Sequence, residues 1–317
     1  MPGGSSPALV RKRSAELLPV PYYHVVFTLP HVLAPLALQN KVLLYGLLFR
    51  AAAQTLLQIA ADPKHLGADI GFMVVLHTWG QTLLAHPHLH CVVPGGGLSP
   101  DCRWIPCGSK FFRPVKVLSV VFRGKFLSGL ERAFKQHKLT LAGQLTPLQS
   151  PTAFAALRRA AAHRKWVVYA KRPFAGPAQV LTYLSRYTHR VAIANSRLIA
   201  MTENKVTFRW RDYTHGSQSR TMSLEADEFL RRFLLHVLPT SFVRIRYFGL
   251  LANRHRAQLL QCCRSYLQTK PTPPLNAPLA AHRCQHCHRG TMRRVEILSP
   301  IQLSAWLPDS PAAENSS

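Results

Sequence analysis

The segment QTLLAHPHLHCVVPGGG, residues 81–97, constrains the fold most, because it places three histidines on alternate positions. In an extended strand every second side chain points to the same face of the sheet. His88 and His90 therefore share one face, and Leu89 between them turns toward a core. Pro87 has no N–H to donate to a sheet ladder, so we expect it at the start of this strand. Two imidazoles on one strand face outline a metal site.

The same spacing has a simpler interpretation, in which the histidines are polar residues on an exposed strand face. A metal site also needs a third ligand. Gln81, on the preceding strand of a predicted hairpin, offers an amide oxygen that suits Mg²⁺ or Mn²⁺, and imidazole favours the latter. His86 and His77 are the alternatives for this third position.

The chain is strongly basic. Its 317 residues include 40 Lys and Arg against 13 Asp and Glu, giving a formal net charge of +27. Such an excess requires a polyanionic partner, with nucleic acid as the first candidate and a membrane surface as its rival. Because no run of 18 apolar residues and no signal peptide is evident, we expect a cytoplasmic, nucleoid-associated protein without membrane contact.

Carboxylates are scarce in the middle of the chain. Between Ile70 and Ala200 the only acidic residues are Asp101 and Glu131. Nucleases that hold two metal ions through three carboxylates need more than this. If the protein cuts DNA, we do not expect carboxylates to be its principal catalytic or metal-binding groups.

Apolar periodicity predicts an α+β fold. We expect strands at residues 22–30, 70–81, 88–98 and 164–174, and helices within 33–62, 111–134 and 176–192. A pair of β-hairpins followed by a helix should occupy residues 195–239, with Ser223 near the helix start.

Composition divides the chain into three predicted segments. Residues 1–20 form a flexible basic arm, 21–266 the main domain with a helical, basic extension, and 267–317 a Pro-rich linker with a small Cys-x-x-Cys knuckle and a disordered tail. Cys284 and Cys287 make half of a possible zinc site, which Cys262 and Cys263 could complete.

The segment YLSRYTHR adds candidate nucleophiles. Tyr183 and Tyr187 are four residues apart, which on a helix places both phenols on one face. A phenolate can attack a phosphodiester if a cation draws charge from the phosphate. In the simpler interpretation, the two rings belong to an aromatic stripe that packs on the sheet.

Four segments in this order carry a family resemblance: YYHVVFTLPH, HTWGQTLLAHPHLHCVVPGGG, VLTYLSRYTHRVAIANSRL and FLLHVLPTSFVRIRYFGLLANRHR. Together they closely resemble the two-tyrosine HUH transposases of bacterial insertion sequences, over residues 22–293. The resemblance implies an antiparallel β-sheet HUH nuclease core flanked by helices, with the histidine pair on a central strand and the tyrosine helix across it.

The resemblance also implies a chemistry. A tyrosine attacks single-stranded DNA at the end of a mobile element, leaving a 5′-phosphotyrosine and a free 3′-OH, and the second tyrosine allows strand exchange. His88 and His90 would be metal ligands, and Tyr183 and Tyr187 the nucleophiles. Residues that could neutralise DNA phosphates, or alternatively form only a solvated basic face, are Arg186, His189, Arg190, Arg244, Arg246, Arg254 and Arg256.

Two other functions fit the sequence. Charge alone would equally suit a non-catalytic nucleic-acid-binding protein. Relatives usually begin with a cysteine-rich, zinc-binding domain, whereas the first cysteine here is Cys91. A truncated, inactive transposase copy is therefore the second alternative.

Overall fold

The computed structural model describes residues 17–108, 115–174, 192–252, 256–267, 282–283 and 291–292. The chain divides into two compact units, residues 1–272 and 273–317. In the second unit, β11 (His282–Arg283) pairs with β12 (Thr291–Met292) in an antiparallel ladder. All other described elements belong to the first unit.

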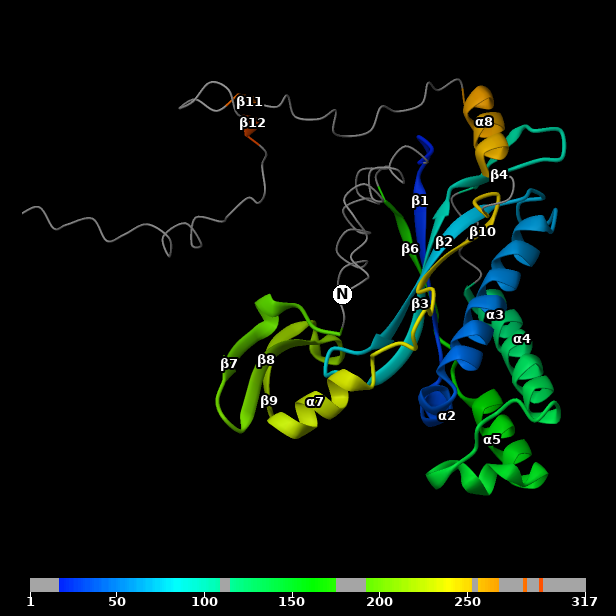
Figure 1. The fold of residues 1–317 in the computed structure, drawn as a ribbon. Helices are drawn as coiled ribbons and strands as arrows, with labels where there is room; N and C mark the ends of the chain where they lie inside the picture. Colours follow the sequence, from blue (N-terminus) through cyan, green and yellow to red (C-terminus); the bar gives the residue numbers. More distant parts are fainter. Residues whose placement is uncertain are drawn as a thin grey trace, which may run out of the picture. The chain divides into compact units, whose positions relative to one another are not determined.

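A five-stranded sheet forms the centre of the first unit (Figure 1). Its strands follow the order β10-β2-β3-β1-β6, and every neighbouring pair is antiparallel. The strand that carries His88 and His90 is the middle one, as the resemblance implied. The strands are β1 (Tyr22–Thr28), β2 (Gly71–Trp79), β3 (Ala85–Pro94), β6 (Val168–Phe174) and β10 (Ile245–Gly249).

One face of this sheet is covered by helices, which confirms the α+β prediction. The principal helices are α3 (Lys41–Ala61) and α4 (Val115–Lys135), which pack against each other. They are accompanied by η1 (His31–Leu33), α2 (Ala34–Gln39), η2 (Gly143–Gln149) and α5 (Pro151–His163). The sequence prediction did not include α5.

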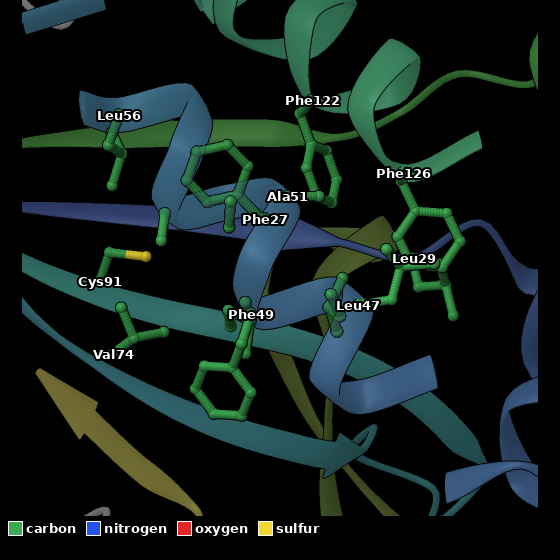
Figure 2. Packing of buried hydrophobic residues seen from close by; sticks show 14 of the residues in the cluster. Phe27, Leu29, Leu47, Phe49, Ala51, Leu56, Val74, Cys91, Phe122 and Phe126 are labelled. Atoms are coloured by element: carbon green, nitrogen blue, oxygen red, sulfur yellow. The ribbon is translucent and has the colours of Figure 1, made fainter. Parts of the chain in front are cut away.

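The main core lies between the helices and this face of the sheet (Figure 2). Phe27 of β1 meets Phe122 of α4 edge to face at 4.9 Å, and Leu89 of β3 is fully buried in the same cluster. Among the described helices, only α3 is long and apolar enough to cross a membrane, and 61% of its most apolar window is buried inside the protein. Its apolar surface is thus explained by the core.

The opposite face of the sheet carries the histidines. Near one end it is covered by α8 (Arg256–Tyr266) and by the small hairpin of β4 (Gly96–Leu98) and β5 (Trp104–Pro106). Met73 and Val92, on neighbouring strands, pack with Leu260 of α8 in this second cluster. The histidines occupy the other end of the same face, because the pleat places alternate residues on it.

Pro87 differs from the prediction, because it is the third residue of β3 rather than the first. The ladder pairs Trp79 with Ala85 and His77 with His88, so His86 and Pro87 together oppose one residue of β2. This is a β-bulge, where a proline is tolerated because its position does not have to donate to the ladder. The bulge shifts the spacing of the three histidines, and His86 is exposed.

A smaller three-stranded sheet follows, formed by β7 (Leu198–Met201), β8 (Lys205–Asp212) and β9 (Gln218–Glu225) in that order. The short turns η3 (Asn195–Arg197) and η4 (Tyr213–His215) flank its strands, and α7 (Ala226–Leu234) packs on it. Ser223 lies inside β9, paired with Thr207, so its predicted place at the helix start was wrong. The N-cap of α7 is Glu225, and the acidic first turn that the sequence indicated is formed by Asp227 and Glu228.

Two glycines give a test of this packing. Gly249 has φ +58°, and a Cβ there would overlap the backbone oxygen of Ile70, whereas a Cβ at Gly124 in α4 would meet no atom within 4 Å. Gly249→Ala should therefore lower the free energy of unfolding by about 3 kcal/mol. Gly124→Ala should raise it by about 0.5–1 kcal/mol, because alanine favours a helix. Urea denaturation of both variants checks this, and equal effects would contradict the close approach at Gly249.

Candidate metal centre

Three imidazoles converge on the face of the sheet opposite the helices. His77 comes from β2, and His88 and His90 come from β3; each offers one nitrogen, and the three nitrogens lie within 4.8 Å of one another. His77 pairs directly with His88 across the ladder, and Val75 pairs with His90. The strand register therefore brings the three side chains together, and they are called the histidine trio below.

The histidine trio is largely sheltered from solvent. His77 is 3% exposed and His90 9%, while His88 is half-buried. The ring centroids of His77 and His90 are 4.3 Å apart, and those of His88 and His90 4.8 Å. This spacing is compatible with three ligands of one ion after small side-chain adjustments.

The protonation states of His77 and His88 suit the binding of a cation. Burial lowers the pKa of His88 to about 4 and lowers the pKa of His77 well below its usual value. Both imidazoles are therefore neutral near pH 7, which is the form that binds a metal. Positive charge nearby, on Arg244, lowers the pKa of His77 further.

Two hydrogen bonds orient the trio. The Nδ1–H of His88 donates to the backbone oxygen of His86 at 2.6 Å, so its Nε2 carries the lone pair. Nδ1 of His90 lies 2.8 Å from Nε2 of His24 on β1, and the two rings stack. If His90 donates this proton, its Nε2 is likewise the ligating atom. Such outer hydrogen bonds fix the tautomer of metal-binding histidines.

Gln81, the predicted third ligand, has a different described contact. Its side-chain oxygen accepts a hydrogen bond from the backbone N–H of Arg211 in β8, at 3.3 Å. The structure brings His77, one of the two alternatives, into the trio instead. Ligation by Gln81 stays a prediction.

The turn between β2 and β3 is held by the smaller sheet and α7. Leu83 in this turn is fully buried, and its backbone oxygen accepts a hydrogen bond from Nε2 of His236 at 2.9 Å. Arg197 donates to the backbone oxygen of Gln81 at 2.5 Å, and Arg232 donates to the backbone oxygen of Thr82 at 3.1 Å. These contacts fix the hairpin from which two strands present the trio.

The predicted phosphate-binding arginines that the structure describes lie in different surroundings. Arg244, half-buried, lies near His77. Arg246 lies over the Phe49 ring at 4.3 Å, on the helix side of the sheet, and Arg256 lies over the Tyr247 ring at 5.7 Å.

Other predicted site residues lie outside the described ranges. These are Tyr183, Tyr187, Arg186, His189, Arg190, Arg254, Cys284 and Cys287. Of the cysteines that could complete a zinc site, Cys263 is buried and the thiol of Cys262 lies 3.3 Å from that of Cys102.

The fold and the trio define a mixed, antiparallel α+β protein with a cluster that could hold a metal ion. The Y2_Tnp family, described as "Putative transposase", matches residues 71–258. The chain belongs to this transposase family, which confirms the resemblance drawn from the four sequence motifs.

Two relatives agree with this assignment. "Putative transposase y4qJ" of Sinorhizobium fredii is 54% identical over 308 residues, covering 91% of this chain and 76% of the relative. "Transposase for insertion sequence element IS801" of Pseudomonas savastanoi pv. phaseolicola is 32% identical over 269 residues, covering 82% of this chain and 62% of the relative. The chain is thus shorter than either relative.

Solved structures give weaker similarity. "Conjugative Relaxase TrwC in complex with OriT Dna. Metal-free structure" aligns with a TM-score of 0.30 at 13% identity, covering 52% of this chain and 71% of that one. A TrwC complex with mutant OriT DNA aligns with a TM-score of 0.31 at 12% identity, covering 78% and 74%. At these scores the family assignment rests on the sequence matches.

Proposed function

We propose that this transposase is a metal-dependent endonuclease and strand transferase that acts on single-stranded DNA at the ends of a mobile element. The observation that carries the proposal is the histidine trio on the central strands of the sheet. The trio is largely sheltered from solvent and burial keeps His77 and His88 neutral near pH 7, which suits the binding of a divalent cation. The scarcity of carboxylates in this part of the chain favours the same conclusion.

His77, His88 and His90 would hold the cation. Of the two predicted ions, an all-imidazole set favours Mn²⁺ over Mg²⁺, which prefers oxygen ligands and keeps its waters. When bound, a divalent cation polarises the phosphate and stabilises charge that develops on its oxygens. The sheltered position of the trio would strengthen this interaction.

Tyr183 and Tyr187 would supply the nucleophiles. The phenolate oxygen of one tyrosine forms a bond to phosphorus, the bond from phosphorus to the 3′ oxygen breaks, and the product is a 5′-phosphotyrosine with a free 3′-OH. The second tyrosine would cleave another strand, and a 3′-OH attacking either phosphotyrosine restores a phosphodiester and completes strand transfer.

The remaining predicted residues would bind DNA phosphates or a zinc ion. Arg244, whose charge acts on His77, would neutralise a bound phosphate, and Arg186, His189, Arg190, Arg254 and Arg256 would extend the basic path. Arg246 lies on the helix side of the sheet, so any phosphate that it binds would lie outside this path. We also propose zinc at Cys284 and Cys287. These activities would place the protein in the cytoplasm at the nucleoid.

The test uses the purified full chain and single-stranded oligonucleotides that span the element's ends, labelled at either terminus, with Mn²⁺ or EDTA. A 3′-labelled strand should become an SDS-resistant adduct, and a 5′-labelled strand should give a shorter free product, only with metal. DNA binding without an adduct at the true ends would instead support a binding protein or an inactive copy.

A further inference from the structure

The outer surface of the helical layer contains a basic groove. A cavity of about 490 Å³ lies between α3 and α4, on the side of the sheet opposite the histidine trio. Residues at helical spacing line it from both helices: Leu43, Leu47, Arg50 and Gln54 of α3, and Lys125, Ser128 and Arg132 of α4, followed by Gln136 just past the end of α4. It is called the α3–α4 groove below.

The charge of the α3–α4 groove is concentrated and one-signed. Four of its thirteen lining residues are Lys or Arg, against 40 in the 317 residues of the chain, and none is acidic. Within the part of the chain that the structure describes, none of these four cations forms an ion pair; they are Arg50, Lys125, Arg132 and Lys138. Unpaired like charges in one groove repel each other, so a bound polyanion would stabilise them.

The neighbouring surface of α4 is different. Lys135 lies 3.1 Å from Glu131, and Arg158 of α5 lies 3.7 Å from the same carboxylate. Lys135 and Arg158 thus share one carboxylate, whereas no described ion pair reaches the four cations of the groove.

The shape of the groove is set by glycines of α4. At Gly129 a Cβ would overlap the Leu47 side chain, so the missing side chain lets the two helices approach closely. At Gly124, also in the lining, a Cβ would meet nothing within 4 Å, so the groove is open there. The result is an aliphatic floor with cationic and amide side chains along its edges.

The lining favours the backbone of duplex DNA over a single strand. Among the described residues that line the groove none is aromatic, and single-stranded sites depend on aromatic side chains on which bases stack. Lys, Arg, Ser and Gln side chains commonly contact phosphates, and such contacts carry no sequence information. From Lys125 to Arg132 the α4 stripe extends about 10 Å, the rise of about three base pairs.

We infer that the α3–α4 groove is a second DNA site, which binds the phosphate backbone of duplex DNA independently of sequence. Single-strand chemistry is proposed for the histidine face, and the groove lies on the other face of the same sheet. The site would hold double-stranded DNA that flanks or receives the element. The inference rests on the groove alone and does not require the proposed cleavage activity.

The test compares two double variants with the same change in charge. Lys125→Gln with Arg132→Gln removes groove cations, while Lys135→Gln with Arg158→Gln removes paired cations beside the groove. Fluorescence anisotropy with a labelled duplex of about 30 base pairs measures affinity across a salt series. We expect the groove variant to bind about 10-fold more weakly near 100 mM salt, with a salt slope less negative by about two. The matched control should stay within about twofold.

A third variant leaves the charge unchanged. Gly124→Leu adds a side chain to the open part of the groove in a helix that tolerates it, and should also weaken duplex binding, by about threefold. Circular dichroism establishes that each variant is folded. Equal losses in the groove and control variants would overturn the inference in favour of non-specific charge.

Two further ligands, a poly-glutamate peptide and single-stranded DNA, test whether the groove binds a different partner. If groove variants lose binding of a poly-glutamate peptide and keep duplex DNA, an acidic protein is the partner and the inference is wrong. If the groove variants lose only the binding of single-stranded DNA, the inference is also wrong. Metal-dependent adducts with short single strands should be unchanged in the groove variants, so a protein that forms no adducts would refute the proposed function and leave the duplex result standing.

Discussion

Replacing both Tyr183 and Tyr187 with phenylalanine should abolish covalent protein–DNA adducts. Phenylalanine keeps the ring and removes the oxygen that would attack phosphorus, so no 5′-phosphotyrosine can form. We expect a loss of about a thousandfold or more in the metal-dependent adduct assay. Affinity for the same single strand should change by less than about threefold, because phosphate contacts dominate binding.

The chain offers a matched control for this double variant. Tyr213 and Tyr266 are exposed tyrosines of the described region. Tyr213→Phe with Tyr266→Phe removes the same two phenol oxygens and should leave adduct formation unchanged. Adducts that persist when Tyr183 and Tyr187 are both replaced would show that another residue is the nucleophile. The two single variants then separate the roles, since strand exchange needs both phenols whereas one suffices for a first cleavage.

Much of the sheet could be predicted because its strands alternate or form short apolar runs. The strand with His88 and His90 was predicted on spacing, and Leu89 is buried on the helix side as the pleat requires. The long apolar stretch that became α2 and α3 was predicted from helical periodicity. The sequence pattern that predicts each of these elements lies within the element itself.

Other elements carry little local signal. The segment of α5 is rich in alanine and arginine, with Phe154 and Ala161 as its buried residues, so its apolar stripe is narrow. Ser223 resembled a helix cap because acidic residues follow it, yet strand pairing with Thr207 extends β9 as far as Glu225. Tertiary pairing overrode the local preference there.

The histidine trio could be predicted only in part. His88 and His90 share a strand, so their spacing is a local signal. His77 joins them through the register of β2 against β3, and that register depends on the bulge at His86 and Pro87. His24 reaches the site because β1 pairs with β3 across 66 residues of sequence. Neither the bulge nor the strand order follows from periodicity.

Replacing His77 with alanine tests which side chain completes the metal centre. If the histidine trio binds the ion, His77→Ala removes one of three ligands and should weaken Mn²⁺ binding by about 100-fold, since even outer hydrogen bonds of metal sites contribute about 10-fold or more. Adduct formation should fall by a similar factor at limiting metal. Isothermal titration with Mn²⁺ and the adduct assay measure the two effects separately.

Gln81→Ala is the decisive comparison, because the sequence favoured Gln81 and the register favours His77. Its described hydrogen bond, from the N–H of Arg211, fastens the β2–β3 turn to the smaller sheet. Gln81→Ala should therefore lower the free energy of unfolding by about 1 kcal/mol while changing Mn²⁺ affinity less than about threefold. His86→Ala, exposed in the same hairpin, should change neither. The opposite result, with metal binding lost in Gln81→Ala and kept in His77→Ala, would mean that the amide is the third ligand and that His77 serves only to pack beside it.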